Sequence, residues 1–225
     1  MILMKDIVYE GDKRLHEVCK PVELPVSDED ADTLRSLLEY VINSQDEEMV
    51  NKYGIRPAVG LAAPQIGVMK RMFAIACYDE KEKLYVLPLI NPKILEHSEE
   101  KVYLNGGEGC ISVKRPTSGL TPRYKWIKIE ALQWNYKRQV FEKIRQTLDG
   151  YIAIVFQHEY DHLDGILYVD KMYNKLPDCK PVMEETEENE NPEDYFSSGV
   201  SFSSVSSASS TTGLQSGSLS YILST

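Results

Sequence analysis

The chain has 225 residues, of which 42% are hydrophobic, and a formal net charge of −10. That length supports one compact domain with a core and leaves too little for two full domains. Seven of the negative charges lie in residues 184–194, so the rest of the chain is only weakly acidic. Because such a chain has no long-range attraction for phosphate backbones, we predict no dedicated nucleic-acid site.

The sequence also bears on the cellular compartment. Its apolar runs stay well short of the roughly 20 residues that cross a bilayer, and residues 1–10 lack the apolar stretch of a secretory signal. Four cysteines are irregularly spaced, at Cys19, Cys77, Cys110 and Cys179, without the density of a disulfide-stapled domain. We therefore expect a cytoplasmic protein with free thiols and no membrane partner, and we take it to be a monomer.

A helix is predicted near the N-terminus. Ser27 followed three residues later by Asp30 is typical of a helix start. Apolar residues then recur at helical spacing, namely Leu34, Leu38, Val41 and Ile42. The helix is expected over about residues 28–50, with one face suited to burial, and Gly54 marks the loop after it.

The middle of the chain is predicted to form strands. Short β-branched or aromatic runs, separated by Asp, Glu, Pro and Gly, are typical of antiparallel strands. They are Met72–Tyr78, Leu84–Ile90, Ile94–Tyr103 and Trp126–Trp134, with Lys137–Thr147 returning as a hairpin partner. From Leu148 to Leu163 the spacing becomes helical again, and Gly165 ends that helix. Helices at both ends of a strand cluster favour an α+β fold over a parallel α/β fold.

The last part of the chain differs in composition. Residues 181–225 are first acidic and then, from Ser197, rich in Ser, Thr and Gly, with few residues that could form a core. We expect one folded domain over residues 1–180 and a tail over residues 181–225 that has no fold of its own or is an artificial extension. The alternative is a segment that docks onto a partner.

The strongest chemical pattern is His158-Glu159-Tyr160-Asp161-His162, inside the last predicted helix. A spacing of four residues places both imidazoles on one helix face, where their nitrogens can bind one cation. Glu159 lies beside them, where a carboxylate can take a proton from a water molecule on that cation. The alternative is a pair of structural histidines, but half of the chain's 4 His would then fall into metal spacing by accident. The pattern indicates a metal-dependent hydrolase.

Two further segments could complete the site. Hydrolytic metal sites usually use three protein ligands, and Cys110 is the candidate for the third, since it lies among small residues in the segment 106–112. A single Cys is otherwise more often a small buried hydrophobe. The segment 58–67 combines small residues with the amide of Gln65, and by itself it predicts only a tight loop leading into the first strand.

Together these three segments resemble the motifs of the peptide deformylase family, in the same order along the chain. They are Gly60-Leu61-Ala62-Ala63-Pro64-Gln65, Glu108-Gly109-Cys110-Ile111-Ser112 and Gln157-His158-Glu159-Tyr160-Asp161-His162. The resemblance runs from the N-terminus to about Lys175, and the chain is similar to the longer forms of Gram-positive bacteria and mycoplasmas. Ala58 departs from the family, which usually has Gly there.

The resemblance implies the fold, the reaction and the metal ligands. A mostly antiparallel sheet would wrap around a C-terminal metal-binding helix, with a further helix near the N-terminus. The enzyme would remove the formyl group from the N-terminal formylmethionine of newly synthesised proteins. Cys110, His158 and His162 would bind one divalent ion, with water as fourth ligand. Fe²⁺ is expected in the cell, with Ni²⁺, Co²⁺ or Zn²⁺ possible in preparations, and these ligands suit all four ions.

The same resemblance implies the catalytic and substrate-binding residues. Glu159 would act as general base and then as proton donor to the leaving amine, while Gln65 and the backbone N–H of Ile111 would stabilise the oxyanion. The methionine pocket would be formed by Val59, Gly60, Tyr151, Ile154 and Val155. The helical spacing of Ile154 and Val155 does not tell whether these residues line the pocket or belong to the core. The bound peptide is expected to lie extended and to pair with the edge of the Gly60 segment.

Two other functions are compatible with parts of the sequence. A metallo-endopeptidase with the same helix pattern would use a third His or Glu ligand downstream, and no His follows His162. An inactive deformylase-like binding protein would have no chemical need to keep Glu159, Gln65 and Cys110 together. Both alternatives therefore explain fewer of the residues than the deformylase does.

Overall fold

The computed structural model describes residues 1–183. Its regular elements, in chain order, are two short 3₁₀ helices, two α-helices, seven strands with a third 3₁₀ turn after the first of them, a last α-helix, a final 3₁₀ turn and an eighth strand. Their bounds are η1 Met4–Asp6, η2 Lys13–His16, α1 Asp28–Asn43, α2 Glu47–Tyr53, β1 Gly60–Ala62, η3 Ala63–Ile66, β2 Met72–Tyr78, β3 Leu84–His97, β4 Lys101–Tyr103, β5 Arg123–Tyr124, β6 Trp126–Asn135, β7 Val140–Asp149, α3 Tyr151–Leu163, η4 Tyr168–Lys171 and β8 Lys180–Pro181. Helices stand at both ends of a strand region, so the α+β class is confirmed.

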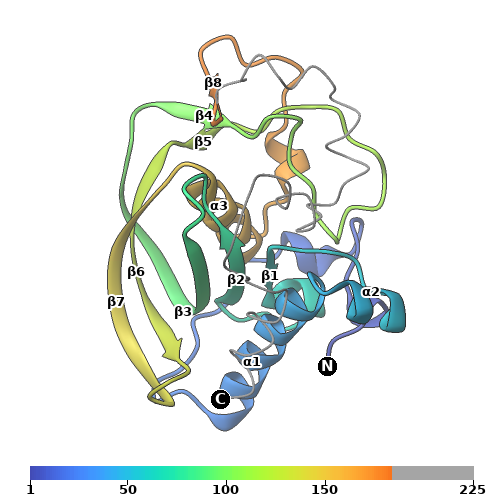
Figure 1. The fold of residues 1–225 in the computed structure, drawn as a ribbon, viewed down its shortest axis with the longest axis vertical. Helices are drawn as coiled ribbons and strands as arrows, with labels where there is room; N and C mark the ends of the chain where they lie inside the picture. The colour runs from blue at the N-terminus through green and yellow to red at the C-terminus, as the bar shows by residue number, and fades with distance from the viewer. Residues whose placement is uncertain (184–225) are drawn as a thin grey trace, which may run out of the picture.

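A five-stranded antiparallel sheet in the order β1-β2-β3-β6-β7 separates α1 from α3 (Figure 1). Successive side chains of a strand point to opposite faces, and strand β2 shows the result. Phe73, Ile75 and Cys77 pack in a cluster with Phe156 of α3, whereas Met72, Ala74 and Ala76 pack in a second cluster with Leu38 of α1. Both faces of β2 are therefore buried, which explains its unbroken apolar run.

A smaller sheet covers α3 from another side. It has the order β5-β4-β8, with β4 antiparallel to β5 and parallel to β8, and β5 contacts α3. In Figure 1 the large sheet curves around α3 while β4 and β5 lie above it. The sheet thus wraps around the C-terminal helix as the family resemblance implied.

The first helix is shorter than predicted. Ser27 caps it, and the Ser27 hydroxyl accepts a hydrogen bond from the N–H of Asp30 at 3.2 Å, as the sequence indicated. The predicted span of residues 28–50 is wrong, however, because the chain breaks after Asn43 and restarts as α2. The Asp46 carboxylate accepts from the backbone N–H groups of Glu48 and Met49, so this short polar side chain supplies an N-terminal cap in place of helix continuation.

Two other boundaries differ from the prediction. Strand β3 is continuous from Leu84 to His97, where two strands were expected. The pairing of β3 with β6 changes register at this point, where Asn91 has a φ of 49°. The next residue, Pro92, has no backbone N–H, so the interruption leaves no donor of that residue unpaired. The predicted helix start at Leu148 is also wrong. Leu148 ends up in β7, where it is fully buried, and Gly150 turns the chain into α3 with φ of 66°.

The predicted tail mostly lies outside the described residues. The described part reaches Met183, and Pro181 pairs with Tyr103 in the small sheet. Within residues 1–183, every helix is too short or too polar to pass through a lipid bilayer.

The packing of the cysteines gives a first test of the fold. Burial raises the pKa of the Cys19 thiol to about 11 and that of Cys77 to about 12, and both are nearly inaccessible. Because alkylation needs an accessible thiolate, iodoacetamide should modify only the half-buried Cys110 and Cys179 in the native, metal-free protein near neutral pH. Peptide mass spectrometry would read the pattern. Rapid native modification of Cys77 would contradict the packing of β2, whereas all four thiols should react in denaturant.

Candidate metal centre

Three ligand atoms converge on one point beside α3. His158 and His162 lie one turn apart on this helix, and Cys110 approaches from the loop between β4 and β5. One ligand atom from each residue lies within 4.8 Å of the other two, and Cys110 Sγ is 3.4 Å from His162 Nε2. Sulfur and nitrogen ligands around a tetrahedral ion at usual bond lengths lie about 3.6 Å apart. The donor set and its spacing therefore fit one divalent cation.

The ring of His158 is oriented by a carboxylate. Its Nδ1 lies 2.7 Å from Oε2 of Glu108, which directs Nε2 toward the other two ligands. Burial acts to lower the pKa of His158, but the hydrogen bonds with Cys110 and Glu108 outweigh it and raise the pKa well above 6.5. The same negative surroundings that favour a proton there would favour a metal cation.

His162 is held neutral by its surroundings. Burial, followed by the nearby charges of His158 and Arg123, lowers the pKa of His162 well below 6.5. Neutral imidazole is the form that binds metals. Within residues 1–183, its Nδ1 is buried without a hydrogen-bond partner.

Glu159 is buried directly against β1. Its side chain is 4% exposed, and a Cβ built on Gly60 would lie only 2.3 Å from Glu159 Oε1. Among the described residues, Oε2 has no hydrogen-bond partner. Burial raises the pKa of the Glu159 carboxyl to about 7, and a bound cation would favour the carboxylate. Gly60 thus has a steric role that the sequence did not reveal: it makes room for this carboxylate.

Gln65 is fixed so that its amide nitrogen faces the site. The Gln65 side-chain oxygen accepts from the N–H of Ala62 at 2.8 Å, and its nitrogen donates to Cys110 Sγ at 3.3 Å and to Ser112 Oγ at 3.1 Å. Because the oxygen is already engaged, the amide cannot flip without losing a buried hydrogen bond. The predicted donor therefore lies beside the predicted ligand.

The N-terminal segment ties the two loops of the site together. Val8 N–H donates to the carbonyl of Gln65, and Glu10 N–H donates to the carbonyl of Ser112, both at 2.8 Å. Ile111 is buried between these loops, and no hydrogen bond from its N–H occurs within residues 1–183. Its backbone donor is therefore available next to Cys110.

The five predicted substrate-binding residues fall on two neighbouring elements. Val59 and Gly60 belong to or precede β1, and Tyr151, Ile154 and Val155 belong to α3, which contacts β1. Val155 is 6% exposed and packs in the same cluster as Phe156, with Val59 and Tyr151 half-buried against that cluster. Val155 is accordingly part of the core. Ile154, at 2% exposed, is buried as well, whereas Val59 and Tyr151 remain partly accessible.

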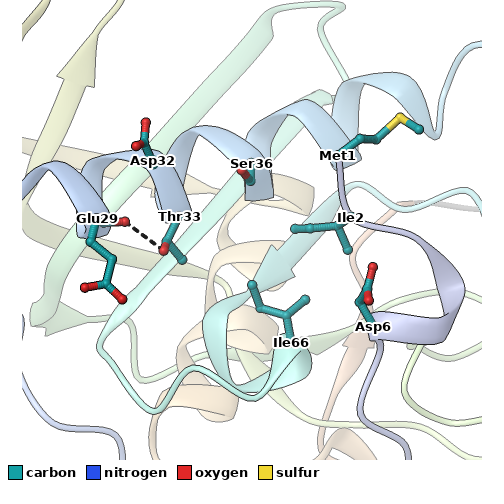
Figure 2. Close-up of a pocket in the computed structure, with 8 residues that line it drawn as sticks. All are labelled: Met1, Ile2, Asp6, Glu29, Asp32, Thr33, Ser36 and Ile66. Carbon is teal, nitrogen blue, oxygen red and sulfur yellow. Dashed lines mark hydrogen bonds between the residues drawn. The ribbon is translucent and has the colours of Figure 1, made fainter.

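An open depression elsewhere on the surface is separate from this site. Figure 2 shows it between α1 and the first residues of the chain, where the lining residues are Met1, Ile2, Asp6, Glu29, Asp32, Thr33, Ser36 and Ile66. Only Ile66 neighbours a predicted site residue in sequence. The depression contains none of the candidate ligands, so it has no part in the chemistry of the metal centre.

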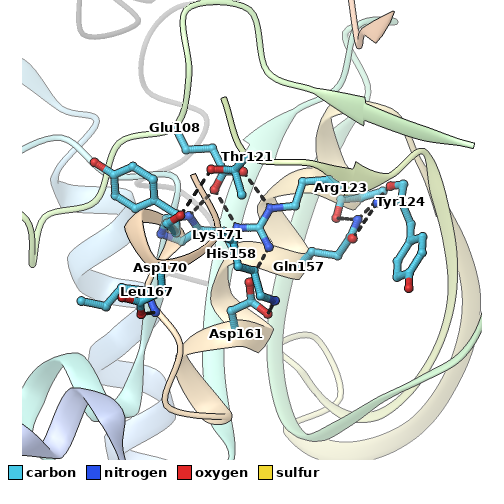
Figure 3. A network of polar contacts seen from close by, with 12 residues as sticks. Glu108, Thr121, Arg123, Tyr124, Gln157, His158, Asp161, Leu167, Asp170 and Lys171 are labelled. Carbon is cyan, nitrogen blue, oxygen red and sulfur yellow. Dashed lines mark hydrogen bonds and ion pairs between the residues drawn. The ribbon is translucent and has the colours of Figure 1, made fainter. Parts of the chain in front are cut away.

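The motifs also contain residues whose roles the sequence did not reveal. Glu108 holds His158, Ser112 accepts from Gln65, and Gln157 hydrogen-bonds to the backbone of Tyr124. Their positions inside the three motifs were the only available signal. Arg123, which binds Glu108, lies outside the motifs and had none (Figure 3).

Comparison with known proteins decides the family. A model of the polypeptide deformylase family matches residues 4–177. The chain belongs to the peptide deformylase family. The predicted resemblance is therefore confirmed, and the fold and the Cys-His-His group can be understood as those of a deformylase.

Curated deformylases of bacilli are similar over most of the chain. One from Halalkalibacterium halodurans is 51% identical over 172 residues, covering 76% of this chain and 92% of the relative. Peptide deformylase 2 of Bacillus cereus is 48% identical over 181 residues, covering 80% and 96%. The expected likeness to Gram-positive deformylases is thus confirmed.

Solved deformylase structures share the fold. The peptide deformylase from Thermotoga maritima has a TM-score of 0.53 at 34% identity, covering 74% of this chain and 96% of its own. A probable peptide deformylase from Synechococcus phage S-SSM7 has a TM-score of 0.56 at 34% identity, covering 73% and 97%. These matches agree with the α+β architecture.

The contact between Gly60 and Glu159 predicts a specific coupling. Gly60→Ala should lower Tm and formate release, because the nearest atoms to the new Cβ are all in the Glu159 side chain, at 2.3 to 2.8 Å. Such overpacking costs about 1–3 kcal/mol. In a Glu159→Ala background these atoms are gone, so the same substitution should leave Tm nearly unchanged. Equal losses of Tm in both backgrounds would show that the clash lies elsewhere.

Proposed function

We propose that this protein removes the formyl group from the N-terminal formylmethionine of newly synthesised proteins. The observation that carries the proposal is the arrangement of Cys110, His158 and His162 around one point. The Gln65 amide nitrogen lies 3.3 Å from Cys110 Sγ, and Glu159 follows His158 on the same helix. A reaction that hydrolyses an amide near neutral pH needs a cation, a proton carrier and an oxyanion donor, and these residues can supply or hold all three.

The cofactor we propose is one Fe²⁺ ion held by Cys110, His158 and His162. Such a cation would polarise the formyl carbonyl and make water a better nucleophile near neutral pH. Ni²⁺, Co²⁺ and Zn²⁺ fit the same sulfur and nitrogen ligands, so availability in the cell would select among them.

Glu159 is proposed to carry the proton. A buried carboxyl at this position can accept a proton from water and return it near neutral pH. It would first act as general base and then donate to the amine that leaves as the new N-terminus. Its neighbour Gly60 leaves room for the carboxylate, because a side chain at that position would displace it.

Two donors are proposed to stabilise the oxyanion of the formyl group. Gln65 presents its amide nitrogen from the buried side, and the N–H of Ile111 lies beside Cys110 on the other loop. Fixed donors of this kind are typically worth about 3–4 kcal/mol each in the transition state. Gln65 would exchange its weak contact with the Cys110 sulfur for the developing oxyanion.

The substrate is proposed to lie between β1 and α3. Strand β1 is an edge strand of the large sheet, so its outer edge can pair with an extended peptide. Val59, Gly60, Tyr151 and Ile154 would surround the methionine side chain, with Val155 closing the pocket from the core. This arrangement would hold the formyl group toward Glu159 and leave the rest of the nascent chain outside.

The setting of the reaction follows from its substrate. We infer a cytoplasmic enzyme, since nascent chains emerge there, acting as a monomer and without a dedicated nucleic-acid site. The catalytic domain would span residues 1–180, with residues 181–225 as an appended tail. The endopeptidase alternative has no support, because the third candidate ligand is a Cys upstream of the helix and the similar curated proteins are deformylases.

A formate assay tests the proposal. Protein loaded anaerobically with Fe²⁺, or reconstituted with Ni²⁺, should release formate from a formyl-Met peptide, and Glu159→Ala should reduce the rate by about 10²–10⁴-fold while still binding metal. Mass spectrometry of the peptide gives the control for internal cleavage. Loss of formyl alone supports the proposal. No formate from metal-loaded wild type, or shorter peptides, would refute it.

A further inference from the structure

A chain of buried ion pairs runs from the candidate metal centre to the surface (Figure 3). At its middle is Arg123 of β5, whose side chain is 3% exposed. Its Nε and Nη2 donate to the two carboxylate oxygens of Glu108 at 2.7 and 2.8 Å, and its Nη1 donates to Asp161 of α3. Each guanidinium nitrogen thus has a carboxylate partner.

The outer end of the chain is also neutralised. The second oxygen of Asp161 accepts from Nζ of Lys171 at 2.7 Å, and the Lys171 side chain is 39% exposed. Two carboxylates therefore face two cations in a region that excludes most water. Removing one member would leave an unpaired buried charge, which is much more costly than losing a surface ion pair.

The inner end of the chain controls a candidate ligand. Glu108 Oε2 accepts from Arg123 and also lies 2.7 Å from His158 Nδ1. Both Glu108 oxygens accept from the Arg123 guanidinium, which is the bidentate arrangement of a carboxylate. A carboxylate can only accept, which places the proton of His158 on Nδ1 and leaves Nε2 for a cation. The paired contact with Arg123 fixes the plane in which Glu108 does this.

The strand that carries Arg123 is itself attached to the metal-binding helix. Gln157 of α3 accepts from the N–H of Tyr124 at 2.9 Å and donates to the Tyr124 carbonyl at 2.8 Å. The helix therefore binds both residues of β5: Gln157 binds the backbone of Tyr124, and Asp161 binds the side chain of Arg123. This gives Gln157 and Asp161 of the last motif a shared task, which is to fix Arg123 relative to His158.

We propose that Arg123 is a positioning residue for the metal centre, acting through Glu108 on the tautomer and orientation of His158. The inference rests on the proposed metal-dependent function. It goes beyond that function because it assigns part of the metal affinity to a side chain that does not itself bind the metal. Partners of metal-bound histidines typically change metal affinity by about 10–100-fold, and we expect the lower end for Arg123 because it acts one residue further away.

Arg71 provides a matched control at the C-terminal end of the same helix. It donates to Asp164 Oδ1 at 2.5 Å and to the carbonyl of Leu163 at 3.3 Å, just after the last turn of α3. Its side chain is 15% exposed. Arg71 therefore anchors α3 by an ion pair, as Arg123 does, but it contacts neither Glu108 nor a candidate ligand.

The test compares Arg123→Lys with Arg71→Lys. Both variants keep the positive charge and lose the planar fork of the guanidinium. The Tm of each metal-free protein and its Kd for Ni²⁺, from competition with a chelator, would be measured beside wild type. Arg123→Lys should bind Ni²⁺ about tenfold more weakly, whereas Arg71→Lys should bind like wild type at a similar loss of Tm.

Other outcomes would overturn the inference. It fails if Arg123→Lys binds Ni²⁺ like wild type, or if both variants lose affinity in proportion to Tm, which would reveal a purely structural role. If Arg123→Lys does not fold, Glu108→Gln takes its place, because Arg123 acts only through this carboxylate, and wild-type affinity would again refute the inference. Wild type that binds Ni²⁺ but releases no formate would refute the proposed function without affecting this comparison.

Discussion

The whole arrangement depends on burying a polar helix face. Helix α3 places Phe156 and Ile152 against the large sheet, and the same helix carries Glu159, Asp161 and His162 in surroundings almost as inaccessible. Buried polar groups are costly unless they have partners. Along residues 1–183 most of those on α3 do, and the exceptions are Glu159 Oε2 and His162 Nδ1. These two atoms keep free hydrogen-bonding capacity, which a reactive site requires.

Charge balance gives a second view of the same design. The two carboxylates and two cations of the Arg123 chain cancel one another. The candidate ligand Cys110 would bind a metal as thiolate, and the carboxyl of Glu159 belongs to the residue after His158 on α3. Together these two groups can contribute two negative charges, which equals the charge of one divalent cation. The structure thus separates the groups that orient the site from those that would face the ion.

The sequence pointed to the candidate ligands more readily than to the residues that support them. His158 and His162 are four residues apart on one helix, so local periodicity alone places them together, and the motif order supplied Cys110. Arg123 stands in a two-residue strand without any pattern, and its partners Glu108 and Asp161 lie 15 and 38 residues away. The contact of Gly60 with Glu159 spans an even larger part of the chain. Such contacts depend on tertiary packing, which no local pattern encodes.

The same distinction explains the errors in the fold. The unbroken apolar, partly aromatic and β-branched run of β2 located it correctly, because both of its faces are buried. The break after Asn43 depends on the cap that Asp46 forms, and the continuity of β3 through Asn91 depends on Val22, whose backbone N–H and carbonyl both bond to the Asn91 side chain at 2.8 and 2.9 Å. Competing hydrogen bonds of this kind decide boundaries, and hydrophobic spacing does not report them.

The identity of the atoms around the bound ion tests the metal centre most directly. X-ray absorption spectroscopy of the Zn²⁺-loaded protein should find one sulfur at about 2.3 Å and two imidazole nitrogens at about 2.0–2.1 Å. This result would place Cys110, His158 and His162 on one cation. A shell of oxygen and nitrogen without sulfur, or with only one imidazole, would contradict the assignment of these three residues as ligands.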